Sequence, residues 1–203
     1  MVHLNLQNST LFRALTDLDN ELRELVKEPI ELNTIGGFAL ILNNVRKNPD
    51  EYTDIDFVGQ DFDSKIRSII GKVGMRHNLG QNWLNNDVSA IDSSIESLEL
   101  MVGEVEFKPI LEMQSLKLNA ARPEDILRMK VVAIDTWIMA MPENEPYTRT
   151  KDFGDIELLL KHTSKNLNTL KAETNEYVIM PETYALIEEY LEHGHNRLVP
   201  IKK

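Results

Sequence analysis

The sequence predicts an α+β fold, in which a mixed sheet with flanking helices over residues 1–121 is followed by a helical bundle over residues 122–203. Segments in which apolar and polar residues alternate are typical of strands, and they lie almost entirely in the first part. After Pro123 the apolar residues recur at helical spacing instead. A mixed region followed by helices favours two packed layers around a sheet, with a helical domain after it.

In the first part, Ser9 or Thr10 caps a helix that ends before Pro29, and Ile30–Ile35 alternates as a strand stopped by Gly36-Gly37. A short buried helix over 38–45 and a strand over 52–58 come next. The remaining elements expected here are a helix over 62–75, a polar loop over 78–86, and strands over 98–102, 105–112 and 115–119.

The second part is predicted to be helical. Pro123 opens a strong helix, and Glu124 and Asp125 lie in its first turn, where acidic residues suit the helix dipole. That helix is expected to end near residue 141. Three more helices are expected over about 151–162, 167–177 and 181–193.

Composition excludes several classes of function. The 22 Lys and Arg residues against 33 Asp and Glu give a net charge of −11, so nucleic acid would bind only at a local basic face. The absence of cysteine excludes disulfides, thiolate nucleophiles and cysteine metal sites. We expect a cytoplasmic protein without a membrane contact, because no segment approaches the roughly 20 apolar residues of a membrane helix and the first residues do not resemble a signal peptide.

The sequence predicts a functional site formed by Gly36 and Gly37 together with Asp54 and Asp56. Residues two apart on a strand point to the same side, so the two carboxylates share a face and repel each other unless a cation sits between them. Oxygen ligands select Mg²⁺ or Mn²⁺, which bind through one or two carboxylates and phosphates. Glycines at a strand-to-helix junction let backbone amides approach a phosphate.

Each of these two motifs also has an explanation that is structural and not functional. Gly-Gly at such a junction is more often a tight turn, and an isolated Asp-x-Asp is more often a solvated edge. Their combination at this spacing, with strand and helix in this order, favours a nucleotide and metal site instead. Trp83, in its polar loop, is either a packing anchor or a surface on which a base stacks.

These motifs resemble the nucleotidyltransferase superfamily with the DNA polymerase β-like fold, and more closely its AbiEii-like bacterial toxin-type branch. The resemblance covers about residues 30–160. It rests on Gly36-Gly37 and on Thr53-Asp54-Ile55-Asp56, followed in order by the segments 81–85 (Gln-Asn-Trp-Leu-Asn), 121–130 (Ala-Arg-Pro-Glu-Asp-Ile-Leu-Arg-Met-Lys) and 151–156 (Lys-Asp-Phe-Gly-Asp-Ile).

The resemblance implies transfer of a nucleoside monophosphate from an NTP to an acceptor such as RNA, tRNA or a protein, in a toxin–antitoxin or phage-defence system with an antitoxin partner. Gly36 and Gly37 would hold the triphosphate, and Asp54 and Asp56 would be both catalytic residues and ligands of Mg²⁺ or Mn²⁺. The family usually adds a third carboxylate, for which Glu99 and Glu112 are the candidates. Without one, the chain would be a catalytically degenerate member that binds a nucleotide or a partner.

Lys130, Lys151, Asp152 and Asp155 have two interpretations. Asp152 and Asp155 share a helix face, so Lys130 on the preceding helix could form a structural ion pair with them. The resemblance instead implies that Lys130 is catalytic and that Lys151 and Asp152 bind the nucleotide, with a lysine reaching the phosphates as a point charge.

Overall fold

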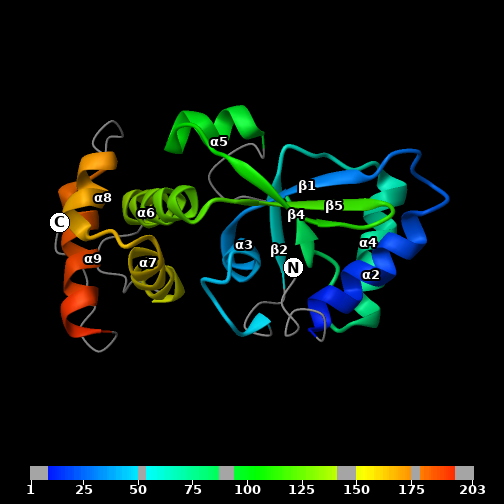
Figure 1. Ribbon diagram of the computed structural model, residues 1–203, viewed down its shortest axis with the longest axis horizontal. Helices are drawn as coiled ribbons and strands as arrows, with labels where there is room; N and C mark the ends of the chain where they lie inside the picture. The colour runs from blue at the N-terminus through cyan, green and yellow to red at the C-terminus, as the bar shows by residue number, and fades with distance from the viewer. Residues whose placement is uncertain (1–8, 50–53, 87–93, 141–149, 175–178, 195–203) are drawn as a thin grey trace. The chain divides into compact units, whose positions relative to one another are not determined.

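The computed structural model describes residues 9–49, 54–86, 94–140, 150–174 and 179–194, and they form an α+β fold (Figure 1). The chain divides into two compact units. Unit 1 runs to Glu99 and includes Val105–Arg122, whereas unit 2 comprises Leu100–Glu104 and everything from Pro123 onward. In the described part of the chain, no helix has the length and apolar character needed to cross a membrane.

Unit 1 is built on a mixed sheet of five strands in the order β3-β2-β1-β5-β4. Strand β1 pairs in parallel with β5 and antiparallel with β2. The helices and strands that lie wholly in unit 1 are α2 (Thr10–Leu22), β1 (Ile30–Thr34), α3 (Gly36–Leu42), β2 (Ile55–Val58), α4 (Ser64–Arg76), β3 (Leu84–Asn85), β4 (Phe107–Glu112) and β5 (Leu116–Ala121). Helix α5 (Ile95–Val102) begins in unit 1 and ends in unit 2.

The two faces of this sheet differ in polarity. Because side chains alternate along a strand, Leu32, Phe57 and Leu118 fall on one face, where each is at most 1% exposed. The other face carries Asn33 and Asp56, which are only half-buried. The apolar face therefore belongs to the core of unit 1, and Asp56 lies on the polar face.

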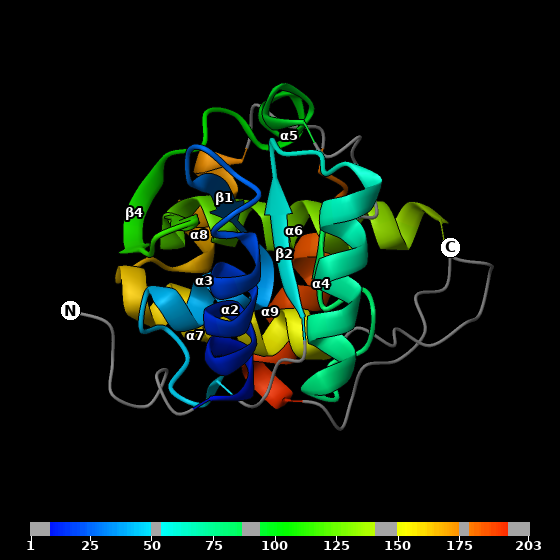
Figure 2. The same ribbon diagram turned by 90° about the vertical axis from the view of Figure 1, so that its right-hand side faces the viewer.

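Helix α2 is fixed to the sheet by a buried acid. Ser9 caps the helix as predicted, with its Oγ accepting a hydrogen bond from Phe12 N. Asp19 Oδ1 accepts hydrogen bonds from the backbone N–H groups of Ser115 (2.6 Å) and Leu116 (3.1 Å), where β5 begins. Helices α2 and α4 pack side by side (Figures 1 and 2).

Trp83 is a packing anchor. Its side chain is 1% exposed, and its Nε1 donates a hydrogen bond of 2.8 Å to the carbonyl of Ile70 on α4. Gly74 leaves room for it, since a Cβ there would come within 2.2 Å of Trp83 Cδ1. The ring is therefore closed to a nucleobase, and the short strand β3 follows it within the segment predicted to be a loop.

Unit 2 is helical in its described part, with α6 (Pro123–Ala140), α7 (Thr150–Thr163), α8 (Leu167–Glu173) and α9 (Pro181–His193). Helix α6 packs against α7 and α9. The start of α9 is held by the buried Asp135 of α6, whose Oδ1 accepts hydrogen bonds from Met180 N (2.9 Å) and Thr183 Oγ1 (2.5 Å). The Phe153 and Tyr190 rings stack with centroids 5.2 Å apart.

One predicted strand is wrong. Residues 98–102 belong to helix α5, which Ser94 caps through a hydrogen bond from Ser97 N. Leu98 and Val102, four apart, are buried, whereas Leu100 is 84% exposed. The prediction was wrong because leucine and glutamate alternate over residues 98–100, as apolar and polar residues do in a strand. The strand predicted over 52–58 is observed over Ile55–Val58, with 52 and 53 outside the described residues.

Candidate functional site

Gly36 is the junction at which strand β1 turns into helix α3. Its φ of +63° lies in the left-handed region that favours glycine. The β2 backbone is adjacent, because Ile35 N donates a hydrogen bond of 2.9 Å to Asp56 O. A Cβ on Gly36 would lie 2.7 Å from Asp56 Oδ2, so the Asp56 carboxylate covers this glycine closely. The structure thus brings together two of the residues singled out in the sequence.

Asp54 and Asp56 flank the beginning of β2. Asp54 is exposed and immediately precedes the strand, and Asp56 is its second residue. Strand alternation favours the same side for both side chains. On the far side of β2, Ile55 N donates a hydrogen bond of 2.6 Å to Trp83 O, and Asn85 is the register partner of Asp56. Gly37, by contrast, is buried within α3.

The donor chemistry of this pair fits a hard divalent cation. Both side chains offer carboxylate oxygens, one exposed and one half-buried. Among the described residues, no group of three or more His, Asp or Glu side chains could hold a metal ion. Mg²⁺ uses one or two carboxylates and completes its shell with phosphate oxygens and water, so the pair fits a cation that arrives with a nucleotide.

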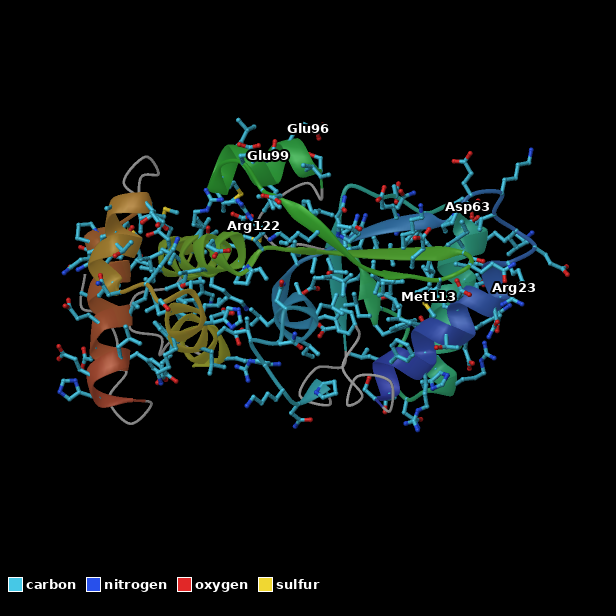
Figure 3. All side chains as sticks on the ribbon, in the orientation of Figure 1. Arg23, Asp63, Glu96, Glu99, Met113 and Arg122 are labelled. Atoms are coloured by element: carbon cyan, nitrogen blue, oxygen red, sulfur yellow. The ribbon has the colours of Figure 1, made fainter. Side chains whose placement is uncertain are left out.

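Glu99 does not lie beside this pair, which corrects its prediction as a third carboxylate on a neighbouring strand. It lies on helix α5 (Figure 3), and its Oε1 is 3.4 Å from Val105 N, which donates to it. Helix α5 begins beyond the opposite end of β2, because a Cβ on Gly59 would lie 2.9 Å from Ile95 Cδ1. The length of β2 therefore separates Gly59 and the start of α5 from Asp54.

Glu112 is also far from the pair. It ends the edge strand β4, and both β5 and β1 lie between that strand and β2. Its register partner is Lys117, whose Nζ is 3.4 Å from its Oε1. Lys117 lies near the start of β5, opposite Glu31, whereas Gly36 follows the other end of β1. Neither proposed third carboxylate therefore adjoins Asp56.

The sequence reasoning missed a row of amides on the polar face of the sheet. Asn119 Nδ2 donates hydrogen bonds to Asn33 Oδ1 (2.8 Å) and Glu31 Oε1 (3.0 Å), joining β5 to β1. Asn33 is on the same face as Asp56. The signal was present in the alternation of both strands, which places Glu31, Asn33 and Asn119 opposite the apolar side chains.

Lys130 forms a buried ion cluster in unit 2. Its Nζ lies 2.7 Å from Asp152 Oδ1 and 2.9 Å from Asp155 Oδ2, and the side chains are 15%, 13% and 0% exposed respectively. Burial works to lower the pKa of Lys130, but the charges and hydrogen bonds of the two carboxylates outweigh it and raise that pKa above the ordinary 10.5. The cluster ties α6 to α7, as the ion-pair interpretation expects.

The other predicted residue of this set, Lys151, lies on the exposed side of α7. Gly36, Gly37, Asp54 and Asp56 belong to unit 1, whereas Lys130, Lys151 and Asp152 belong to unit 2. No protein-family model, curated protein or solved structure matches the chain. Functional inference therefore depends on the geometry of the described residues.

Proposed function

We propose that the chain is a metal-dependent nucleotidyltransferase that moves a nucleoside monophosphate from an NTP to an acceptor. The observation that carries the proposal is the Asp56 carboxylate lying against Gly36, where a strand ends in a left-handed turn and a helix begins. A carboxylate ligand and a backbone without a Cβ then adjoin one another. That combination suits phosphoryl transfer, because its catalysis depends mainly on positioning and charge neutralisation.

In this proposal Asp54 and Asp56 hold Mg²⁺ or Mn²⁺. A bound divalent cation supplies Lewis acidity and charge neutralisation at the transferred phosphoryl group. Gly36 allows the Asp56 carboxylate to lie against the start of α3, and the amides of Gly36 and Gly37 are the expected phosphate donors beside it. The acceptor hydroxyl forms the new bond to the α-phosphorus, and pyrophosphate leaves.

The roles implied for Lys130, Lys151 and Asp152 stay predictions. The two carboxylates around Lys130 favour a positioning role for it over a direct phosphate contact, since its charge is already balanced. The exposed Lys151 is the better candidate for contact with a nucleotide. Replacing each lysine by methionine in a transfer assay separates these roles, because the loss of a phosphate-binding lysine raises KM for the NTP while leaving stability intact.

The proposal is tested with purified full-length protein, Mg²⁺ or Mn²⁺, each α-³²P-labelled NTP, and total RNA or cellular protein as acceptor. Label should be transferred, and Asp56→Asn should abolish the transfer. Glu24→Gln, which removes an exposed acid beyond the end of α2, is the matched control and should have no effect. Absence of transfer with every metal, NTP and acceptor, or full activity of Asp56→Asn, would refute the proposal.

A second candidate is a catalytically degenerate member that binds a nucleotide or a protein partner. The positions of Glu99 and Glu112, away from Asp56, favour it. Calorimetry would then show NTP binding that depends on Asp56, without turnover. The toxin role and the antitoxin partner belong to the first proposal: expression should arrest bacterial growth, and Asp56→Asn should relieve the arrest.

A further inference from the structure

Helix α4 is basic, although the chain as a whole is acidic. It contains Lys65, Arg67, Lys72 and Arg76 and no acidic residue. Arg67, Lys72 and Arg76 line one open groove of about 910 Å³, whose other wall includes Glu21 of α2. Arg67 pairs with Asp61 and Arg76 with Glu21, and both arginines remain at least half exposed. The groove and the partner of Arg67 at its edge thus present three cations and two carboxylates to solvent, and Lys72 has neither of these carboxylates as its partner.

Gly71 leaves the backbone of α4 uncovered on the side of the groove. Glycine within a helix costs about 1 kcal/mol relative to alanine. At Gly71 a Cβ would meet nothing closer than 3.8 Å, so packing does not require glycine there. Gly74, one turn later, does require it, because a Cβ would lie 2.0 Å from Gly80 O. Gly71 lines the groove, where the missing side chain lets a ligand approach the helix backbone.

The chain joins one wall of the groove to the segment that contacts the candidate site. Gln81 and Asn82 line it, and the chain continues directly into Trp83, which pairs with the start of β2 between Asp54 and Asp56. The groove and the two carboxylates thus belong to the same unit, and the backbone contact between Trp83 and Ile55 connects their segments. The net charge of −11 does not prevent an anionic ligand from binding in the groove, because charges beyond about 8 Å are largely screened at physiological salt.

We propose that this α4 groove binds the phosphate backbone of a single-stranded polynucleotide acceptor and directs its end toward Asp54 and Asp56. The inference rests on the proposed function. A polynucleotide fits better than an acidic polypeptide, because it carries both the backbone charge that Arg67, Lys72 and Arg76 would contact and the terminal hydroxyl that the reaction consumes. The uncharged Gln81 and Asn82 supply amide donors beside them.

The test measures fluorescence anisotropy of a 5′-labelled single-stranded oligoribonucleotide with the full chain, in EDTA and without NTP. Lys72→Ala should weaken binding about threefold to tenfold and lower the slope of log K against log salt by about 0.7. Glu21→Gln should tighten binding, since it removes the groove's carboxylate and releases Arg76. Gly71→Ala should weaken binding without loss of stability. Lys108→Ala, on exposed β4, is the matched control and should change nothing.

Equal affinities of Lys72→Ala and wild type, or no tightening in Glu21→Gln, would overturn the inference. It would also be overturned if a poly-glutamate peptide bound as tightly, with the same dependence on Lys72, because the partner would then be an acidic polypeptide. The two proposals fail separately. Groove-dependent RNA binding without label transfer refutes only the nucleotidyltransferase, and transfer to RNA with unchanged KM in Lys72→Ala refutes only the groove.

Discussion

Replacing Gly36 with alanine tests the geometry on which the candidate site depends. The left-handed φ of +63° costs a non-glycine residue about 1–2 kcal/mol. The new Cβ would also lie 2.7 Å from Asp56 Oδ2, closer than such atoms approach in folded proteins. The carboxylate is the end of a short side chain, so it can rotate away at a cost of about 1 kcal/mol. We expect Gly36→Ala to destabilise unit 1 by about 2–3 kcal/mol in total.

The assay uses the chain's two tryptophans. Trp83 is buried in unit 1 and Trp137 belongs to unit 2, so a Trp137→Phe background makes fluorescence report the unfolding of unit 1 alone. Urea unfolding of four variants in that background forms a double-mutant cycle: the parent, Gly36→Ala, Asp56→Ala, and both together. Removing the Asp56 carboxylate relieves the clash but not the backbone strain.

The cycle should therefore give a coupling energy of about 1 kcal/mol, with the double variant more stable than the sum of the single effects predicts. Additive effects would mean that the carboxylate does not lie against Gly36. A Gly36→Ala protein within about 0.5 kcal/mol of the parent would mean that the left-handed turn is absent. Either result would refute the reasoning about this site.

Three further predictions concern the rest of the chain. Lys130→Met should destabilise unit 2 by about 3–5 kcal/mol, since it removes the cation that Asp152 and Asp155 contact in a largely buried cluster. Because the folded pKa of Lys130 is raised, its contribution is complete below pH 10.5 and is lost as pH rises through the folded pKa. Thermal melts followed by circular dichroism should therefore show the wild-type advantage shrinking only above pH 10.5. Gly74→Ala should lower the free energy of unfolding by about 2–3 kcal/mol through its clash with Trp83. Gly71→Ala should raise it by up to about 1 kcal/mol, because nothing in the structure clashes with a Cβ there. If urea unfolding showed Gly71→Ala to be the less stable of the two variants, the packing of α4 would be contradicted. Asp135→Ala should cost about 2–4 kcal/mol and increase amide exchange at the start of α9, since it removes two buried hydrogen bonds; unchanged exchange there would contradict that contact.

The sequence predicted best the elements whose boundaries carry local chemistry. Ser9 at the start of α2 and Pro123 at the start of α6 lie where the helices begin. The turn from β1 into α3 at Gly36 was equally clear, because only glycine adopts its conformation easily. These signals are local in sequence, so no tertiary information is needed to interpret them.

The errors came from patterns that only tertiary packing resolves. Leu98-Glu99-Leu100 alternates like a strand, but burial of Leu98 and Val102 selects a helix. Because residues 98–102 were predicted to be a strand, Glu99 was expected to project from a strand beside Asp56, and this expectation was wrong for the same reason. Strand order is equally non-local, so the sequence could not show that β5 and β1 separate Glu112 from β2. The α4 groove was missed because its walls come from separate elements.

The most direct test of the central claim is Mn²⁺ binding in the presence of a non-hydrolysable NTP, measured by the electron paramagnetic resonance signal of free Mn²⁺. Wild-type protein and the exposed-acid control Glu24→Gln should bind one nucleotide-dependent Mn²⁺, and Asp54→Ala and Asp56→Ala should each lose it. If both aspartate variants bind the same Mn²⁺ with unchanged affinity, the two carboxylates beside Gly36 do not form a metal and nucleotide site.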